Sequence, residues 1–151
     1  MTPRIDHKAL QPRAAAAMNR LDGSVELDPL LRELVNLRAS QINGCAYCID
    51  MHTKDARAAG ETEQRLYAVS AWRETPFFSE RERAALAMCE AVTLVADGQV
   101  PDAVWEQAAG EFPPEELAAL LFAIVAINGY NRLAIATRME VGGYQPAAVS
   151  G

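Results

Sequence analysis

Runs of alanine recur along the chain, and they constrain its fold more than any other feature. The runs AAAA, AALA and AALLFAIVA occupy residues 14–17, 84–87 and 118–126. Alanine is the best helix former and adds little volume to a core. Half of the residues are hydrophobic but only 7% are aromatic, which favours closely packed helices. We therefore predict an all-α protein, and 151 residues suit a single domain, 1–151.

Helix-starting and helix-ending residues divide the chain into segments. Asp28 before Pro29 predicts the start of a helix, and the dipeptide at 43–44, Asn-Gly, predicts its end. Ser79 and Glu82 form a capping-box pattern. These signals and the apolar periodicity predict helices over residues 7–20, 27–40, 45–59, 61–73, 79 to about 97, 101–109 and 113–138. Residues 139–151 are predicted to form a loop tail.

The charge of the chain argues against several kinds of partner. The net charge is −6, the pI is about 4.9, and the basic residues form no block, which disfavours nucleic acids and anionic membranes. We find no apolar run of the roughly 20 residues that span a bilayer and no secretory signal in the opening MTPRIDHKAL. Three cysteines do not suit an extracellular disulfide scaffold. We expect a cytoplasmic protein.

Residues 41–57, QINGCAYCIDMHTKDAR, bring Cys45, Cys48 and His52 within eight positions. On a helix over 45–59 these three side chains share one otherwise apolar face. Cα atoms three residues apart on a helix are about 5 Å apart, a distance that a disulfide accepts. The free N–H groups of a first helical turn favour a thiolate, so at least one cysteine is expected to have a lowered pKa. His52 is close enough to exchange a proton with Cys48.

Glu33 is the predicted partner of His52. Along their helices Glu33 lies about 12 Å before the turn at 43–44 and His52 about 10 Å after it, so an antiparallel hairpin brings them to the same height. Glu33 also lies in an apolar stretch, which predicts partial burial suited to proton transfer. The alternative is a surface ion pair of Glu33 with Arg32 or Arg38.

The two thiols, the imidazole and the carboxylate match the needs of peroxide reduction. This reaction requires a thiolate nucleophile, a proton for the departing oxygen and a second thiol that traps the sulfenic acid. We expect an exposed Cys45 and a deeper Cys48, with no cofactor and no metal. Two alternatives stay open: a purely structural pair, and a zinc site of Cys45, Cys48, His52 and Glu33, although structural zinc usually takes more thiolates.

The pattern Glu-x11-Cys-x2-Cys-x3-His, formed by Glu33, Cys45, Cys48 and His52, resembles the core of the AhpD-like alkylhydroperoxidases of the carboxymuconolactone decarboxylase superfamily. The downstream stretches SAWRETPFFSERERAALAMCEAVT and INGYNRLAIATR are also similar, so the resemblance covers about residues 25–138. It implies a single-domain helical bundle that assembles as a homo-trimer or homo-hexamer. It also implies a thiol-dependent peroxidase that reduces alkyl hydroperoxides.

The resemblance also implies roles for the four residues. Cys48 would become the sulfenic acid, Cys45 would be the proton donor and resolving thiol, and His52 with Glu33 would form the proton relay. An external dithiol such as a lipoyl protein would reduce the disulfide. The founding peroxidases have a second histidine where this chain has Tyr47, which weakens the relay. The lactone decarboxylases of the superfamily generally lack the thiol pair.

Two other functions remain as alternatives to the peroxidase. The first is a cofactor-free decarboxylase in which His52 and Glu33 do acid–base chemistry, and the second is a non-enzymatic redox sensor. Among other residues, Cys89 lies in an apolar stretch and is expected to be a small buried hydrophobe. His7 is expected to be solvated, and Asn131 is expected to brace neighbouring helices.

Overall fold

A computed structural model describes residues 2–146 of the protein, and within this range it is built of helices without strands. The prediction of an all-α fold is therefore confirmed. In chain order the helices are α1 (His7–Leu10), α2 (Pro12–Gly23), α3 (Pro29–Asn43), α4 (Ala46–Ala58), α5 (Glu63–Ala68), the 3-10 helix η1 (Val69–Glu74), α6 (Glu80–Thr93), α7 (Asp102–Glu111) and α8 (Pro114–Thr137).

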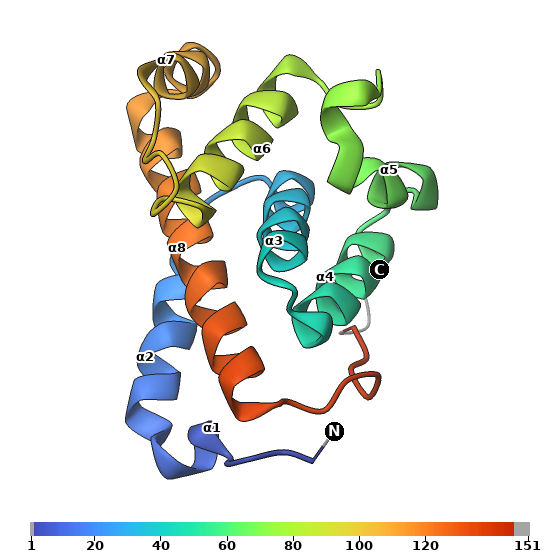
Figure 1. Ribbon diagram of the computed structural model, residues 1–151, viewed down its shortest axis with the longest axis vertical. Helices are drawn as coiled ribbons and strands as arrows, with labels where there is room; N and C mark the ends of the chain where they lie inside the picture. The colour runs from blue at the N-terminus through green and yellow to red at the C-terminus, as the bar shows by residue number, and fades with distance from the viewer. Residues whose placement is uncertain (1, 147–151) are drawn as a thin grey trace.

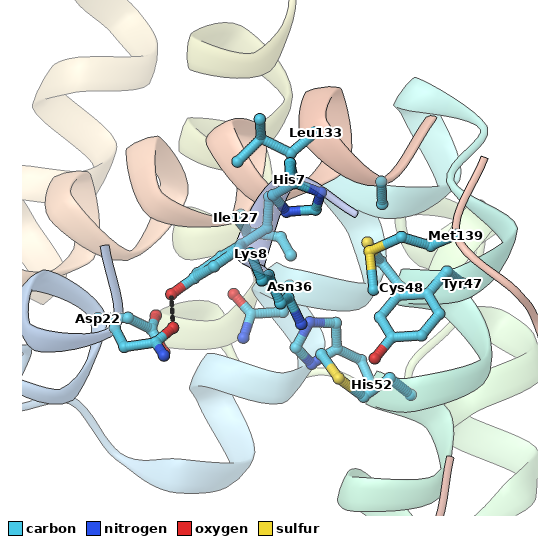
Figure 2. A pocket seen from close by; sticks show the side chains of 14 residues that line it. His7, Lys8, Asp22, Asn36, Tyr47, Cys48, His52, Ile127, Leu133 and Met139 are labelled. Atoms are coloured by element: carbon cyan, nitrogen blue, oxygen red, sulfur yellow. Dashed lines mark hydrogen bonds between the residues drawn. The ribbon is translucent and has the colours of Figure 1, made fainter. Parts of the chain in front are cut away.

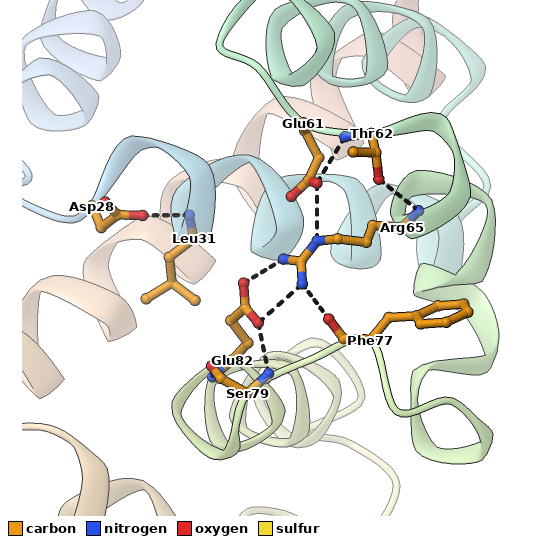
Figure 3. Close-up of polar contacts among 8 residues, drawn as sticks. All are labelled: Asp28, Leu31, Glu61, Thr62, Arg65, Phe77, Ser79 and Glu82. Carbon is orange, nitrogen blue, oxygen red and sulfur yellow. Dashed lines mark hydrogen bonds and ion pairs between the residues drawn. The ribbon is translucent and has the colours of Figure 1, made fainter.

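Helix α3 lies in the middle of the molecule and packs against α4, α6 and α8 (Figure 1). Its start is fixed as the sequence predicts, because the carboxylate of Asp28 accepts a hydrogen bond of 2.9 Å from the backbone N–H of Leu31 (Figure 3). Its end is fixed by Gly44, whose φ of +70° lies in the left-handed region that glycine adopts without strain. The chain then reverses directly into α4, so the predicted α3–α4 hairpin is present.

The core fills the space between α3, α6 and α8. Val35, Met88, Leu120 and Ile124 are fully buried there. Each such side chain contributes about 1.5–3 kcal/mol relative to an exposed one. Ala84 and other alanines of α6 are buried as well, so small side chains allow the helices to approach closely, as the alanine runs predict.

Arg65 ties α5 to the start of α6. Its guanidinium binds Glu61 at 2.9 Å, the carboxylate of Glu82 and the backbone carbonyl of Phe77 (Figure 3). Glu82 also accepts a hydrogen bond from the backbone N–H of Ser79, which completes the predicted capping box. One carboxylate therefore both caps α6 and holds the preceding loop.

Three predicted segments differ from the structure. The segment 7–20 is two helices, because Gln11 adopts a non-helical conformation and Pro12 begins a new helix. The segment 61–73 continues as a 3-10 helix with a non-helical Ala71. Helix α6 ends at Thr93 rather than near residue 97, since the chain turns over 94–98.

Within residues 2–146, helix α8 is the one helix whose length and apolar composition, taken alone, would allow it to cross a membrane. It packs against α2, α3 and α6, and 44% of its most apolar stretch is buried inside the protein. Such burial is typical of the core helix of a folded domain. Beyond α8 the chain has no helix up to residue 146, as the predicted tail requires, and residues 147–151 of that tail lie outside the described residues.

Candidate active site

Cys45 occupies the N-cap position of α4 rather than its first turn. Its backbone is extended, with φ −84° and ψ 93°, so its side chain folds back over the helix start. There the sulfur accepts a hydrogen bond of 3.4 Å from the backbone N–H of Cys48. Both cysteines are unbridged and only 1% exposed, so the prediction of an exposed Cys45 is wrong. Cys48 is the one of the two that lines a pocket.

The two sulfurs shift each other's pKa in opposite directions. A hydrogen bond from the Cys48 thiol lowers the pKa of Cys45 from 9.0 to about 7, helped by the backbone N–H of Cys48 and by nearby His52. The same hydrogen bond, followed by burial, raises the pKa of Cys48. The prediction that one cysteine of the pair has a lowered pKa is confirmed, and that cysteine is Cys45. Above about pH 7 the negative charge of the pair is therefore favoured on Cys45, behind the thiol that faces the pocket.

His52 and Glu33 meet across the α3–α4 hairpin, as its geometry predicts. Their Nδ1 and Oε2 atoms are 2.8 Å apart. Because a carboxylate only accepts hydrogen bonds, Nδ1 carries a hydrogen, and whenever the imidazole is neutral Nε2 has a free lone pair. Nε2 is buried and has no hydrogen-bond partner within the described part of the chain. It is therefore available to a molecule in the pocket that His52 and Cys48 both line.

The alternative of a surface ion pair for Glu33 is not supported. Arg32 pairs with Asp22, and Arg38 pairs with Glu90 at 2.8 Å. Both candidate cations are thus engaged elsewhere. The side chain of Glu33 is 18% exposed, which agrees with the predicted partial burial.

A buried polar network behind the sulfurs was missed by sequence reasoning. Asn131 of α8 is fully buried, donates to the hydroxyl of Ser40 at 3.0 Å and accepts from the amide of Asn43 at 2.9 Å. Asn131 braces α8 against α3, as expected of it. Its side chain also lowers the pKa of both sulfurs by hydrogen bonding, and Ser40 does the same for Cys48. The available signal was the presence of polar side chains within apolar stretches.

The pocket in front of Cys48 has a volume of about 220 Å³. Figure 2 shows its walls: Cys48 and His52 come from α4, Leu133 comes from α8, and His7 and Lys8 come from the N-terminal segment. The prediction that His7 is solvated is wrong, because this side chain is half-buried in the pocket wall. Tyr47, which replaces a histidine of the founding peroxidases, lines the same pocket, and burial raises its pKa.

The donor atoms near the site do not form the zinc site considered above. Among the described residues, the group whose ligand atoms lie within 4.8 Å of one another is Glu33, His52 and Asp55, and it includes no cysteine. The atoms in this group already have partners, since His52 binds Glu33 and Asp55 accepts hydrogen bonds from the hydroxyl of Tyr144. The arrangement is that of a hydrogen-bonded relay rather than an open metal site.

Comparison with known proteins places this arrangement in a family. Residues 12–91, more than half of the chain, match the sequence profile of the carboxymuconolactone decarboxylase family. The chain belongs to that family. This family member is 39% identical over 139 residues to YdfG, an uncharacterised protein of Bacillus subtilis (strain 168), and the match covers 90% of this chain and 95% of YdfG.

Two solved structures of similar proteins extend this comparison. The first is ATU0492 of Agrobacterium tumefaciens, a protein of unknown function described as a candidate antioxidant defence protein AhpD. The two structures superpose with a TM-score of 0.91 and share 38% sequence identity, and the match covers 95% of this chain and 100% of ATU0492. The second is a peroxidase-related protein of Silicibacter sp. TM1040, with a TM-score of 0.76 and 25% identity, over 89% of this chain and 72% of that one. This carboxymuconolactone decarboxylase family member therefore has the AhpD-like fold that its cysteine motif resembles.

Proposed function

We propose that this protein is a thiol-dependent peroxidase that reduces small alkyl hydroperoxides through Cys48 and Cys45. The observation that carries the proposal is that Cys48 and His52 line one pocket, and that Nε2 of His52 has no hydrogen-bond partner among residues 2–146. Behind them lie a low-pKa Cys45 and the carboxylate of Glu33. The similarity to a candidate antioxidant defence protein and to a peroxidase-related protein supports the same function.

The first step uses Cys45 as the base for Cys48. Because Cys45 carries the charge and Cys48 the shared proton, transfer of that proton to Cys45 leaves a thiolate that faces the pocket. The Cys48 thiolate attacks the terminal oxygen of the hydroperoxide, and the O–O bond breaks. Cys48 becomes a sulfenic acid, and the released alkoxide takes the proton from Cys45 to give the alcohol.

The second step closes the disulfide. The Cys45 thiolate attacks the sulfur of Cys48, and the sulfenic hydroxyl leaves as water. The proton for this water enters from solvent and is delivered by Nε2 of His52, while Glu33 stabilises the imidazolium from the Nδ1 side. The sum is one hydroperoxide, one proton, one thiolate and one thiol converted to alcohol, water and a disulfide. An external dithiol, such as a lipoyl group, then reduces the disulfide.

The assembly and location of the protein are part of the same proposal. The family resemblance suggests a homo-trimer or homo-hexamer, and Phe122 and Val125 of α8, each 55% exposed, offer an apolar face for a second copy. A thiol pair that needs an external dithiol suits the cytoplasm.

The test is consumption of cumene hydroperoxide by the prereduced protein, with dithiothreitol as the donor. We expect Cys48→Ser to abolish turnover and Cys45→Ser to leave a sulfenic acid on Cys48 that dimedone traps. Cys89→Ser is the matched control and should keep full activity, because Cys89 lies outside the pocket and burial raises its pKa to about 12. Circular dichroism of each variant reports whether it is folded.

Turnover that survives in a folded Cys48→Ser variant would contradict the proposal. Activity on a carboxymuconolactone-like acid that survives loss of both cysteines would instead support acid–base catalysis by His52 and Glu33. A change of oligomer mass on oxidation without turnover would support a redox sensor.

A further inference from the structure

The N-terminal segment forms one wall of the thiol pocket. The backbone N–H of Arg4 donates to the carbonyl of Thr137 at 2.9 Å, which fastens the segment to the end of α8. The carboxylate of Asp6 then accepts a hydrogen bond of 3.1 Å from the backbone N–H of Lys8. These contacts hold α1 over the pocket, so His7 and Lys8 become part of its lining (Figure 2).

Lys8 supplies a cation that no carboxylate balances. Its ammonium group makes no ion pair with any residue in the range 2–146. Asp22, the acidic residue in the pocket lining, pairs with Arg32, and the carboxylate of Asp6 accepts hydrogen bonds from the backbone N–H groups of Lys8 and Ala9. Lys8 is exposed and lines the pocket. Although the protein has a net charge of −6, this lysine therefore makes the pocket mouth a local binding site for a negative group.

The rest of the pocket suits a small apolar body. Ile127, Leu133 and Met139 provide apolar contacts, and the volume of about 220 Å³ lies below the roughly 300–1,000 Å³ of typical ligand pockets. Asn36 also lines it and is only 5% exposed, and its side-chain amide makes no hydrogen bond to any described residue. The amide of this largely buried residue offers a donor and an acceptor to a bound molecule.

We propose that the pocket selects small apolar hydroperoxides that carry an anionic group, and that Lys8 is the residue that recognises the anion. The inference rests on the proposed peroxidase function and adds its substrate class. A carboxylate held by Lys8 at the mouth directs the other end of the molecule inward, toward Cys48 and His52. The chemical step is the one described above and needs no further reactant.

The test compares cumene hydroperoxide with its para-carboxylate in single-turnover oxidation of the prereduced protein, without any reductant. We expect the wild type to react about 5-fold to 10-fold faster with the carboxylate, a preference that falls with added salt. Lys8→Met should remove the preference, so that the carboxylate and the neutral peroxide react at equal rates, and Lys8→Glu should reverse it. The control Arg13→Met removes the same charge from an exposed site on α2, outside the pocket, and should keep the preference.

A second measurement separates this inference from the peroxidase proposal. The corresponding alcohols, with and without the carboxylate, are titrated into Cys48→Ser by calorimetry. If no variant reacts with peroxide but the carboxylate binds more tightly and Lys8→Met removes that difference, the anion site stands and the peroxidase proposal fails. Equal rates and affinities for the two compounds in the wild type would overturn the inference, as would a preference that Lys8→Met retains or that Arg13→Met also loses.

Discussion

The state of the thiol pair leads to a prediction that can be tested without a substrate. The pKa of Cys45 is lowered from 9.0 to about 7, and the largest cause is the hydrogen bond from the Cys48 thiol. A lowering of this size corresponds to about 3 kcal/mol in favour of the thiolate. In Cys48→Ala this hydrogen bond is lost, while burial, which raises the pKa, stays. We therefore expect Cys45 to titrate above pH 8 in this variant, roughly one to two units higher than in the wild type.

The measurement is the pH dependence of thiolate absorbance, with alkylation rates of the tryptic peptides to assign the sulfur. The wild type should show one thiolate forming near pH 7, because burial raises the pKa of Cys89 to about 12 and the hydrogen bond with Cys45 raises that of Cys48. Cys89→Ala is the control and should leave this titration unchanged. A Cys48→Ala variant that still titrates near pH 7, or a Cys45→Ala variant that does so, would refute the assignment of the charge to Cys45.

Three further changes have expected outcomes. Glu33→Gln removes the carboxylate that binds Nδ1 of His52, so kcat/KM for hydroperoxide should fall by about 100-fold, and an unchanged rate would remove Glu33 from the relay. Gly44→Ala should lower the free energy of unfolding in urea by about 1 kcal/mol, because φ is +70° and the added Cβ meets no atom within 4 Å, and Gly44→Asn should cost less. Arg65→Met should lower the free energy of unfolding by about 2–3 kcal/mol in the same assay, because it leaves the buried Glu61 unpaired. The control Arg57→Met breaks an exposed ion pair and should lower it by less than about 0.5 kcal/mol.

The parts of the fold that the sequence predicted are those set by local chemistry. The Asp28 cap, the Gly44 turn and the Ser79–Glu82 capping box each depend on residues within four positions of one another, and all three are present. The end of α6 was placed too late because residues 94–98 contain no proline and reach a glycine only at their last position. Where a helix frays into a turn, the local signals do not differ enough to show the boundary.

The candidate site shows the same division. Glu33 and His52 could be paired from the sequence because one short turn relates their two helices. Lys8 and Asn131 reach the pocket or the sulfurs from α1 and α8, far along the chain from the cysteines, and no periodicity reports such contacts. The exposure of Cys45 was predicted wrongly for a smaller reason: at an N-cap the backbone is extended, so its side chain does not continue the helical face.

The position of both sulfurs at one end of α4 also determines how the scaffold responds to oxidation. A disulfide between residues three apart would enclose a ring of only four residues. The entropy lost by the unfolded chain would then stabilise the folded protein by about 2 kcal/mol, less than a disulfide that joins distant segments would. Such a bridge would cross-link no two helices. Closing the bridge would thus raise the melting temperature by about 4–8 °C, and the protein could pass through its redox cycle without gaining or losing a contact between helices.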